Sequence, residues 1–316
     1  MRNLAGPRRQ QLLALARDGA PANALRFAVN FRGQRRVIAR RYVFDALARI
    51  TPRVAVDVDG LRVYLNTSDK AVSRSIFARG LYERELFTSA LSVLKRGGSN
   101  GRIDGHFLDI GANIGTATCL ALKQFGASQA WTFEPSPDNV DVLRHNVLAN
   151  GLQQLVYVHP CALSDRDGAI ELELSHDNWG DHRVRVVENT REPGLLDEES
   201  RDTIEVPCRR LDALVEAGSL EIGSVGLAWI DVQGHEAHVL GGASALLDSQ
   251  VPIICEYWPY GLRRAGGLDR FHELVLRYRD VLVDLGAPRS GAMPAADLPR
   301  LATRYRGLAF TDLLLL

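Results

Sequence analysis

Acidic residues and glycines gather where expected strands pass into helices, and these are the residues best suited to chemistry. Asp109 precedes the run Gly111-Ala112-Asn113-Ile114-Gly115, which lies between an expected strand at 106–110 and an expected helix at 115–125. Glycine lets a backbone approach a ligand closely, and a helix N-terminus offers free N–H donors. Because ligands of parallel sheets bind at the carboxyl ends of the strands, we expect a nucleotide-like ligand over this turn.

A second acid narrows the choice of ligand. Glu134 ends the next expected strand, where a carboxylate can accept from a ribose diol, at roughly 1.5–3 kcal/mol for a charge-assisted hydrogen bond. The G-x-x-x-G spacing differs from the G-x-G-x-x-G typical of pyrophosphate sites. A positively charged ligand with a ribose and no phosphate suits this acidic surrounding, and S-adenosylmethionine has these properties. A pair of glycines that only pack helix against strand is the alternative.

A third group of polar residues follows a later strand, in Asp231-Val232-Gln233-Gly234-His235-Glu236. Methyl transfer depends on alignment of the reacting atoms, and a hydroxyl acceptor also benefits from a general base. Asp231, His235 and Glu236 are the candidate catalytic residues. Histidine has an ordinary pKa near 6.5, which suits a base at neutral pH. Glu236 is equally suited to capping the helix that follows.

Substrate contacts are expected from two further places. Asp181, His182 and Arg183 lie in a polar stretch at 175–203 that we interpret as a long loop over the site, and Glu256 ends another expected strand. A salt-bridged turn is the alternative for the first three residues. Asp231 and Glu256 have no convincing third oxygen partner, so no metal site is expected.

The order and spacing of these motifs resemble the methyltransferase domain of the FkbM family, over about residues 80–257. The matching pieces are Gly80-Leu81-Tyr82-Glu83, Leu108–Gly115, Phe133-Glu134-Pro135, Ala162-Leu163-Ser164-Asp165, Gly180–Arg183, Leu211-Asp212, Ile230–Glu236, Val239–Ala243 and Cys255-Glu256. Members are class I enzymes that use S-adenosylmethionine, and several methylate hydroxyl groups of natural products or sugars. The resemblance implies O-methylation of a small molecule, sugar or glycan.

The resemblance also implies roles for single residues. The amino acid end of the cofactor would lie against Tyr82, Glu83, Asp109, Gly111, Asn113 and Gly115. Glu134 would bind the ribose, and Asp231 would lie beside the methyl group. The adenine would be flanked by Ala162, Leu163, Ser164 and Asp165.

The elements that must position these residues alternate between strand and helix from residue 106 onward. This pattern predicts a Rossmann-like α/β fold. The resemblance implies that its sheet is mainly parallel, has seven strands and is flanked by helices. We expect this domain to span 76–316. Residues 1–75 would form an N-terminal extension, with helix-like periodicity within 8–50 and then a β-hairpin around Asp59-Gly60. Two short helices, broken at Gly80, are expected within 68–95.

Composition excludes several classes of protein. The 316 residues are 46% hydrophobic and 24% charged with no net charge, which is typical of a globular chain. No apolar run approaches the ~18 residues of a membrane span, and no signal peptide is evident at the start. Four scattered cysteines indicate a reducing, cytoplasmic setting. Arginines outnumber lysines 35 to 3, which suits a GC-rich bacterial source.

Charge is distributed unevenly along the chain. Residues 1–53 hold 12 arginines and two acids. Such a segment either docks on the acidic remainder, which we favour, or contacts an anionic surface such as a membrane. Sparse aromatic residues argue against nucleic acid, and the sequence does not indicate an oligomeric state.

Two other functions stay open at this point. A nicotinamide-dependent oxidoreductase could use a similar sheet, although the glycine spacing and Glu134 argue against it. A cofactor-binding scaffold without turnover is the second alternative.

Overall fold

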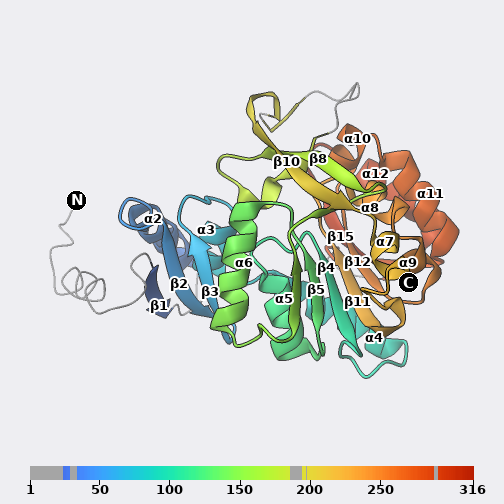
Figure 1. The fold of residues 1–316 in the computed structure, drawn as a ribbon, viewed down its shortest axis with the longest axis horizontal. Helices are drawn as coiled ribbons and strands as arrows, with labels where there is room; N and C mark the ends of the chain where they lie inside the picture. Colours follow the sequence, from blue (N-terminus) through green and yellow to red (C-terminus); the bar gives the residue numbers. More distant parts are fainter. Residues whose placement is uncertain (1–23, 29–33, 186–193, 197, 288–290) are drawn as a thin grey trace. The chain divides into compact units, whose positions relative to one another are not determined.

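The computed structural model describes residues 24–28, 34–185, 194–196, 198–287 and 291–316 (Figure 1). The chain divides into two compact units, Met1–Leu81 and Tyr82–Leu316. The second unit therefore begins at Tyr82, a few residues after the boundary expected at 75/76.

The first unit contains a small sheet with strand order β1-β2-β3, in which β1 is parallel to β2 and β2 antiparallel to β3. Its elements are β1 (Ala24–Ala28), α2 (Gln34–Leu47), β2 (Arg53–Val58), β3 (Leu61–Asn66) and α3 (Val72–Arg79). Asp59 and Gly60 have φ of 48° and 75°, so the expected tight hairpin is confirmed. The helical interpretation of residues 8–50 is wrong at Ala24–Ala28, which form strand β1. Pairing with β2 gives these residues an extended conformation. Residues 1–23 and 29–33 of that prediction lie outside the described residues.

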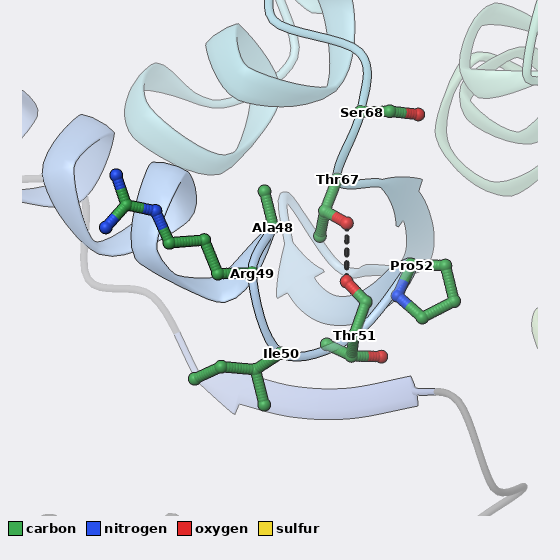
Figure 2. Close-up of a pocket in the computed structure, with 7 residues that line it drawn as sticks. All are labelled: Ala48, Arg49, Ile50, Thr51, Pro52, Thr67 and Ser68. Atoms are coloured by element: carbon green, nitrogen blue, oxygen red, sulfur yellow. Dashed lines mark hydrogen bonds between the residues drawn. The ribbon is translucent and has the colours of Figure 1, made fainter.

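A shallow pocket of about 390 Å³ also lies in this unit (Figure 2). It is lined by Ala48, Arg49, Ile50, Thr51, Pro52, Thr67 and Ser68. The Thr67 hydroxyl donates to the Thr51 carbonyl at 2.5 Å and ties the end of β3 to the start of β2. Its lining offers hydroxyls and one guanidinium, with no carboxylate or imidazole for acid–base chemistry.

The main sheet of the second unit has strand order β14-β13-β15-β12-β11-β4-β5-β6. Its strands are β4 (His106–Ile110), β5 (Ala130–Phe133), β6 (Val156–His159), β11 (Val225–Ile230), β12 (Ile253–Tyr257), β13 (Val281–Asp284), β14 (Ala292–Pro294) and β15 (Thr311–Leu315). Strands β6, β5, β4, β11 and β12 are parallel, and β15 lies antiparallel between β12 and β13. The short edge strand β14 makes eight described strands where seven were expected.

Helices cover this sheet in two layers. They are α4 (Glu83–Arg96), α5 (Thr116–Leu120) with a π-helical continuation at Ala121–Phe125, α6 (Pro137–Ala149), α7 (Leu211–Glu216), α8 (Glu236–Gly241), α9 (Ser244–Asp248), α10 (Pro259–Arg264), α11 (Leu268–Tyr278) and α12 (Leu298–Arg304). Figure 1 shows α5 and α6 on one side of the sheet and α8, α9 and α11 on the other. The apolar core includes Leu108, Ile230 and Phe271. Among the described residues, none of the helices has the length and apolar character needed to span a bilayer.

A second, four-stranded sheet interrupts the alternation. Its order is β7-β10-β8-β9, with β7 (Ala162–Leu163), β8 (Gly168–Leu174), β9 (Arg183–Val184) and β10 (Asp202–Arg209). Ile170, Leu172 and Val206 form its own small core. The stretch at 175–203 is therefore not one long loop in its described part, because β9 pairs with β8 and a 3₁₀ turn forms at Trp179–Asp181.

Candidate functional site

The turn after β4 is shaped by three residues with positive φ. Gly111, Asn113 and Gly115 have φ of 88°, 49° and 79°. A Cβ on Gly111 would lie 1.8 Å from the carbonyl oxygen of Asp231, because the ends of β4 and β11 touch here. Asn113 shows that the conformation is reached even without glycine, and its Oδ1 is buried with no partner among the described residues. A buried acceptor without a donor fits a site that binds a hydrogen-bonding ligand.

Glu134 lies directly after β5 and faces the same turn. One carboxylate oxygen accepts from the backbone N–H of Asn113 at 2.9 Å, and the other accepts from the N–H of Ser136 at 2.9 Å. The Asn139 amide donates to Glu134 at 3.4 Å and to the carbonyl of Trp179 at 3.2 Å. The carboxylate is therefore fixed between β4 and α6. Burial raises its pKa to about 7.

Two more acids lie close to the turn. Asp109 is buried within β4 and accepts from the hydroxyl of Thr118, and burial raises its pKa to about 7. Glu83, at the start of α4, accepts from the hydroxyl of Thr116. Tyr82 precedes it with 53% of its surface exposed. Glu83 and Asp109 thus lie beside the glycine turn through Thr116 and Thr118, and Tyr82 is the chain neighbour of Glu83.

A second carboxylate group forms where β11 and β12 end and the antiparallel strand β15 begins. Gln233 has a left-handed backbone, with φ of 55°, and its amide donates to Asp231 at 2.6 Å. The same nitrogen lies 3.2 and 3.3 Å from the two carboxylate oxygens of Glu256. Asp312 of β15 is paired in register with Glu256. Asp312 was not among the residues predicted from the sequence, although it is the lone acid in the apolar run Thr311–Leu316.

Burial and mutual repulsion act together on this group. Burial raises the pKa of Asp231 to about 6, and burial with the nearby Asp231 charge raises that of Asp312 to about 8. The pKa of Glu256 is raised well above its ordinary value, first by burial and then by the charges of Asp231, Glu236 and Asp312. The charge of Asp231 also raises the pKa of Asp109 and of Glu134. Asp231 therefore interacts with the acids of both groups.

The geometry does not support His235 as a base. Its Nε2 is 2.9 Å from the Ser164 hydroxyl, its ring stacks on His238 at 4.3 Å, and it is only 4% exposed. Burial, with help from His238, lowers its pKa to about 3. Such a ring is neutral at physiological pH and is a weak base.

Glu236 has a structural role in this arrangement. It is fully buried, and one carboxylate oxygen accepts from the backbone N–H groups of Val232 and Gly234, each at 3.1 Å. Burial raises its pKa to about 7. Glu236 therefore holds the turn that carries Gln233, and this leaves Asp231 as the best placed of the three catalytic candidates.

Of the three substrate residues expected in the 175–203 stretch, Asp181 and Arg183 form an ion pair with each other. Arg183 donates to Asp181 at 2.7 and 2.9 Å and to Glu198 at 3.2 Å, and its guanidinium lies 5.0 Å from the ring of Trp258. The side chains of all three ion-paired residues are at least nine-tenths buried. This is the salt-bridged turn that was the alternative, so Arg183 is not free to clamp an anion. His182 accepts from the backbone N–H of Ser175, and burial lowers its pKa to about 4.

The segment expected to flank adenine is also engaged within the protein. Ala162 and Leu163 are buried in the two cores. The Ser164 hydroxyl pairs with His235, and Asp165 forms an ion pair with Arg270. Binding of adenine by these polar side chains would require exchange of those bonds.

The site as a whole is rich in negative charge. Carboxylates from α4, β4, β5, β11, β12 and β15 converge at the carboxyl edge of the parallel strands. Within the described residues, no three histidine, cysteine or acidic side chains are arranged to hold a metal ion. The strand order, the antiparallel strand β15 inserted between β12 and β13, and the acid-flanked glycine turn define the class: a Rossmann-like class I methyltransferase fold.

The comparison with known families gives the particular family. The model for the methyltransferase FkbM domain matches residues 109–279, more than half of the chain, and the chain belongs to this family. This confirms the resemblance found in the sequence.

Three relatives illustrate the similarity. The 2-O-methyltransferase NoeI of Sinorhizobium fredii is 30% identical over 159 residues, covering 49% of this chain and 63% of the relative. The hexuronic acid methyltransferase AglP of Haloferax volcanii is 31% identical over 149 residues, covering 47% and 54%. A crystal structure of methyltransferase FkbM from Methylobacillus flagellatus aligns with a TM-score of 0.42 and 13% identity, covering 77% of this chain and 52% of that one. The chain thus spans less than two thirds of the length of each relative.

Proposed function

We propose that the protein transfers a methyl group from S-adenosylmethionine to a hydroxyl group of a sugar or glycan. The observation that carries this proposal is the convergence of buried carboxylates around the Gly111–Gly115 turn. Family membership supports the reaction class. The 2-O-methyltransferase activity named for NoeI supports a hydroxyl acceptor, and the hexuronic acid named for AglP supports a sugar. Four free, buried cysteines support a cytoplasmic location.

The residues present fit this cofactor. When bound, it supplies a methyl group on a positively charged sulfur. Glu134, fixed by two backbone N–H donors, would accept from the ribose hydroxyls. The buried Oδ1 of Asn113 and the carboxylates of Asp109 and Glu83 would face the amino acid end, where an ammonium group meets their negative charge.

Asp231 is proposed to accept the proton of the acceptor hydroxyl. It is half-buried, lies beside the glycine turn, and has a pKa of about 6. A carboxylate with this pKa is mostly ionised near pH 7 yet more basic than an ordinary aspartate, as general-base catalysis requires. Glu256, whose pKa burial and the neighbouring acids raise well above its ordinary value, would form a hydrogen bond with a hydroxyl of the sugar.

The charge of the site favours a neutral acceptor. An acidic sugar would bring its own carboxylate against Asp231, which is mostly ionised near pH 7 with a pKa of about 6, and like charges this close repel. We therefore propose a neutral sugar hydroxyl as acceptor, in contrast to the hexuronic acid named for AglP.

The test is methyl transfer measured by mass spectrometry with panels of neutral and acidic sugars. We expect a mass gain of one methylene on a neutral sugar. Asp231→Asn should lower kcat by about 10²- to 10⁴-fold, and His235→Gln by less than about tenfold. Transfer only to acidic sugars, or full activity in Asp231→Asn, would refute the assignment.

A further inference from the structure

The outer face of helix α2 in the first unit is apolar and exposed. Ile38, Tyr42 and Val43 expose 60%, 72% and 45% of their surfaces, and Ile50, just beyond the helix, exposes 70%. Ala39 and Ala46 are exposed on the same helix. Together these six residues form what we call the α2 face. The opposite face carries Phe44 and Leu47, which are buried in the unit.

Cationic side chains accompany the α2 face. Arg36 and Arg49 are exposed, and the only acid within α2, Asp45, is paired with Arg74 at 2.6 Å. By sequence, Met1–Leu81 holds 16 basic and five acidic residues, a net charge of +11, so the rest of this neutral chain carries −11. Exposed aliphatic and tyrosine side chains can enter the boundary between headgroups and acyl chains of a bilayer while neighbouring arginines pair with its phosphates.

The positive charge of the first unit indicates which partner the α2 face would bind. A second copy of the same face would bring one strongly positive unit against another, which is unfavourable. An anionic bilayer offers both an apolar interior for Ile38, Tyr42 and Ile50 and phosphate groups for the arginines. We propose that the α2 face docks this protein on anionic membrane surfaces.

The experiment is flotation of the full chain with vesicles of phosphatidylcholine, alone or mixed with phosphatidylglycerol. We expect binding to the mixed vesicles only. The triple variant Ile38→Ser, Tyr42→Ser, Ile50→Ser should lower the partition coefficient by at least about tenfold, because it removes the apolar contact. Leu148→Ser with Leu276→Ser, at exposed positions of the second unit, is the matched control and should bind as the native protein does.

Other outcomes overturn the proposal. Binding that persists in the triple variant and disappears only in high salt would mean attraction by charge without docking of the α2 face. Absence of vesicle binding by a monomer would refute the proposal. A dimer that the triple variant dissociates would assign the face to a second copy instead. Circular dichroism and melting curves establish that each variant is folded.

A different observation, the left-handed backbone of Gln233, carries a second inference. A glutamine with φ of 55° adopts a conformation that L-residues rarely occupy, and such outliers cluster where function requires them. The strain places one amide nitrogen between Asp231 and Glu256. We infer that Gln233 is a positioning residue, which orients Asp231 and stabilises its ionised form; this rests on the proposed function.

The surroundings make this role necessary. The charge of Asp231 raises the pKa of Glu236 from α8, Glu256 from β12 and Asp312 from β15, and it does the same to Asp109 in β4 and Glu134 after β5. Burial raises the pKa of Asp231 itself, and the amide of Gln233, its donor among the described side chains, lowers it. Without that amide, burial would favour protonation of Asp231.

Gln233→Gly tests this role, because glycine accepts the backbone conformation while the amide is lost with the rest of the side chain. We expect nearly unchanged affinity for S-adenosylmethionine, a kcat lowered by about 10- to 100-fold, and an acidic limb of the kcat profile moved to higher pH. Unchanged kcat and pH profile, or loss of cofactor affinity, would overturn the inference. If the native protein methylates no acceptor, the proposed function fails separately, and ¹³C NMR of the Asp231 carboxyl still reports whether the variant raises its pKa.

Discussion

Replacement of Glu134 by glutamine tests how the ribose is held. The carboxylate already accepts one backbone N–H on each oxygen, and each oxygen has a further lone pair for a ribose hydroxyl. Glutamine keeps the shape but turns an NH₂ group toward one of these N–H donors and removes the charge. The loss of charge-assisted hydrogen bonding, roughly 1.5–3 kcal/mol, corresponds to cofactor affinity about 10- to 150-fold weaker.

Isothermal titration calorimetry near pH 8, where Glu134 is ionised, measures this effect. Asp138→Asn is the matched control, since Asp138 is exposed in the first turn of the same helix α6. We expect the control to bind as the native protein does. Equal affinity of Glu134→Gln and the native protein, with both folded, would refute the ribose assignment.

Three further predictions address the electrostatics, the turn and the ion-pair network. In the folded protein, Asp109 and Glu134 have pKa values of about 7 and Asp312 one of about 8, against ordinary values of 3.8, 4.5 and 3.8. Between the ordinary and the raised values, the folded state binds more protons than the unfolded state. The free energy of unfolding therefore falls as pH rises through this range. Urea unfolding should therefore give a lower free energy of unfolding near pH 8 than near pH 5, and equal free energies at the two pH values would contradict this reasoning. The cationic cofactor should also stabilise the fold more than its neutral demethylated product does. Gly111→Ala should abolish cofactor binding in calorimetry because its Cβ would lie 1.8 Å from the Asp231 carbonyl oxygen, whereas Gly151→Ala, with φ of 70° and open space, should bind normally. Arg183→Ala should lower the free energy of unfolding by about 1.5–3 kcal/mol, because it removes the charge-assisted hydrogen bonds of a buried guanidinium while Asp181 keeps Arg201 and Glu198 keeps Arg264. Exposed Arg185→Ala should change it by less than about 0.5 kcal/mol; similar effects of the two would show that the network is not important for stability.

The order of strands and helices in the second unit could be predicted from the sequence because each element has its own local signal. The glycine turn, Glu134 and Asp231 follow apolar strands directly, so their place at the carboxyl edge followed from the βαβ rule. The Asp59-Gly60 hairpin was equally local. These residues lie where the sequence placed them.

The remaining features depend on contacts between distant parts of the chain. Pairing of β8 with β10 forms a second sheet from a polar stretch. The local sequence of that stretch has no periodicity that predicts this pairing. Arg183 and Glu198 lie 15 residues apart, so their ion pair was invisible in sequence. His235 looked like a base because its residue type suits one, but burial against Ser164 and His238 changes its chemistry. Asp312 joins the site through antiparallel pairing with Glu256.

The most direct measurement is a crystal structure of the full chain with S-adenosylhomocysteine. The account predicts the ribose hydroxyls on the carboxylate of Glu134, the amino acid end at the Gly111–Gly115 turn, and the sulfur facing Asp231. A ligand located elsewhere, or a ribose that makes no contact with Glu134, would contradict it.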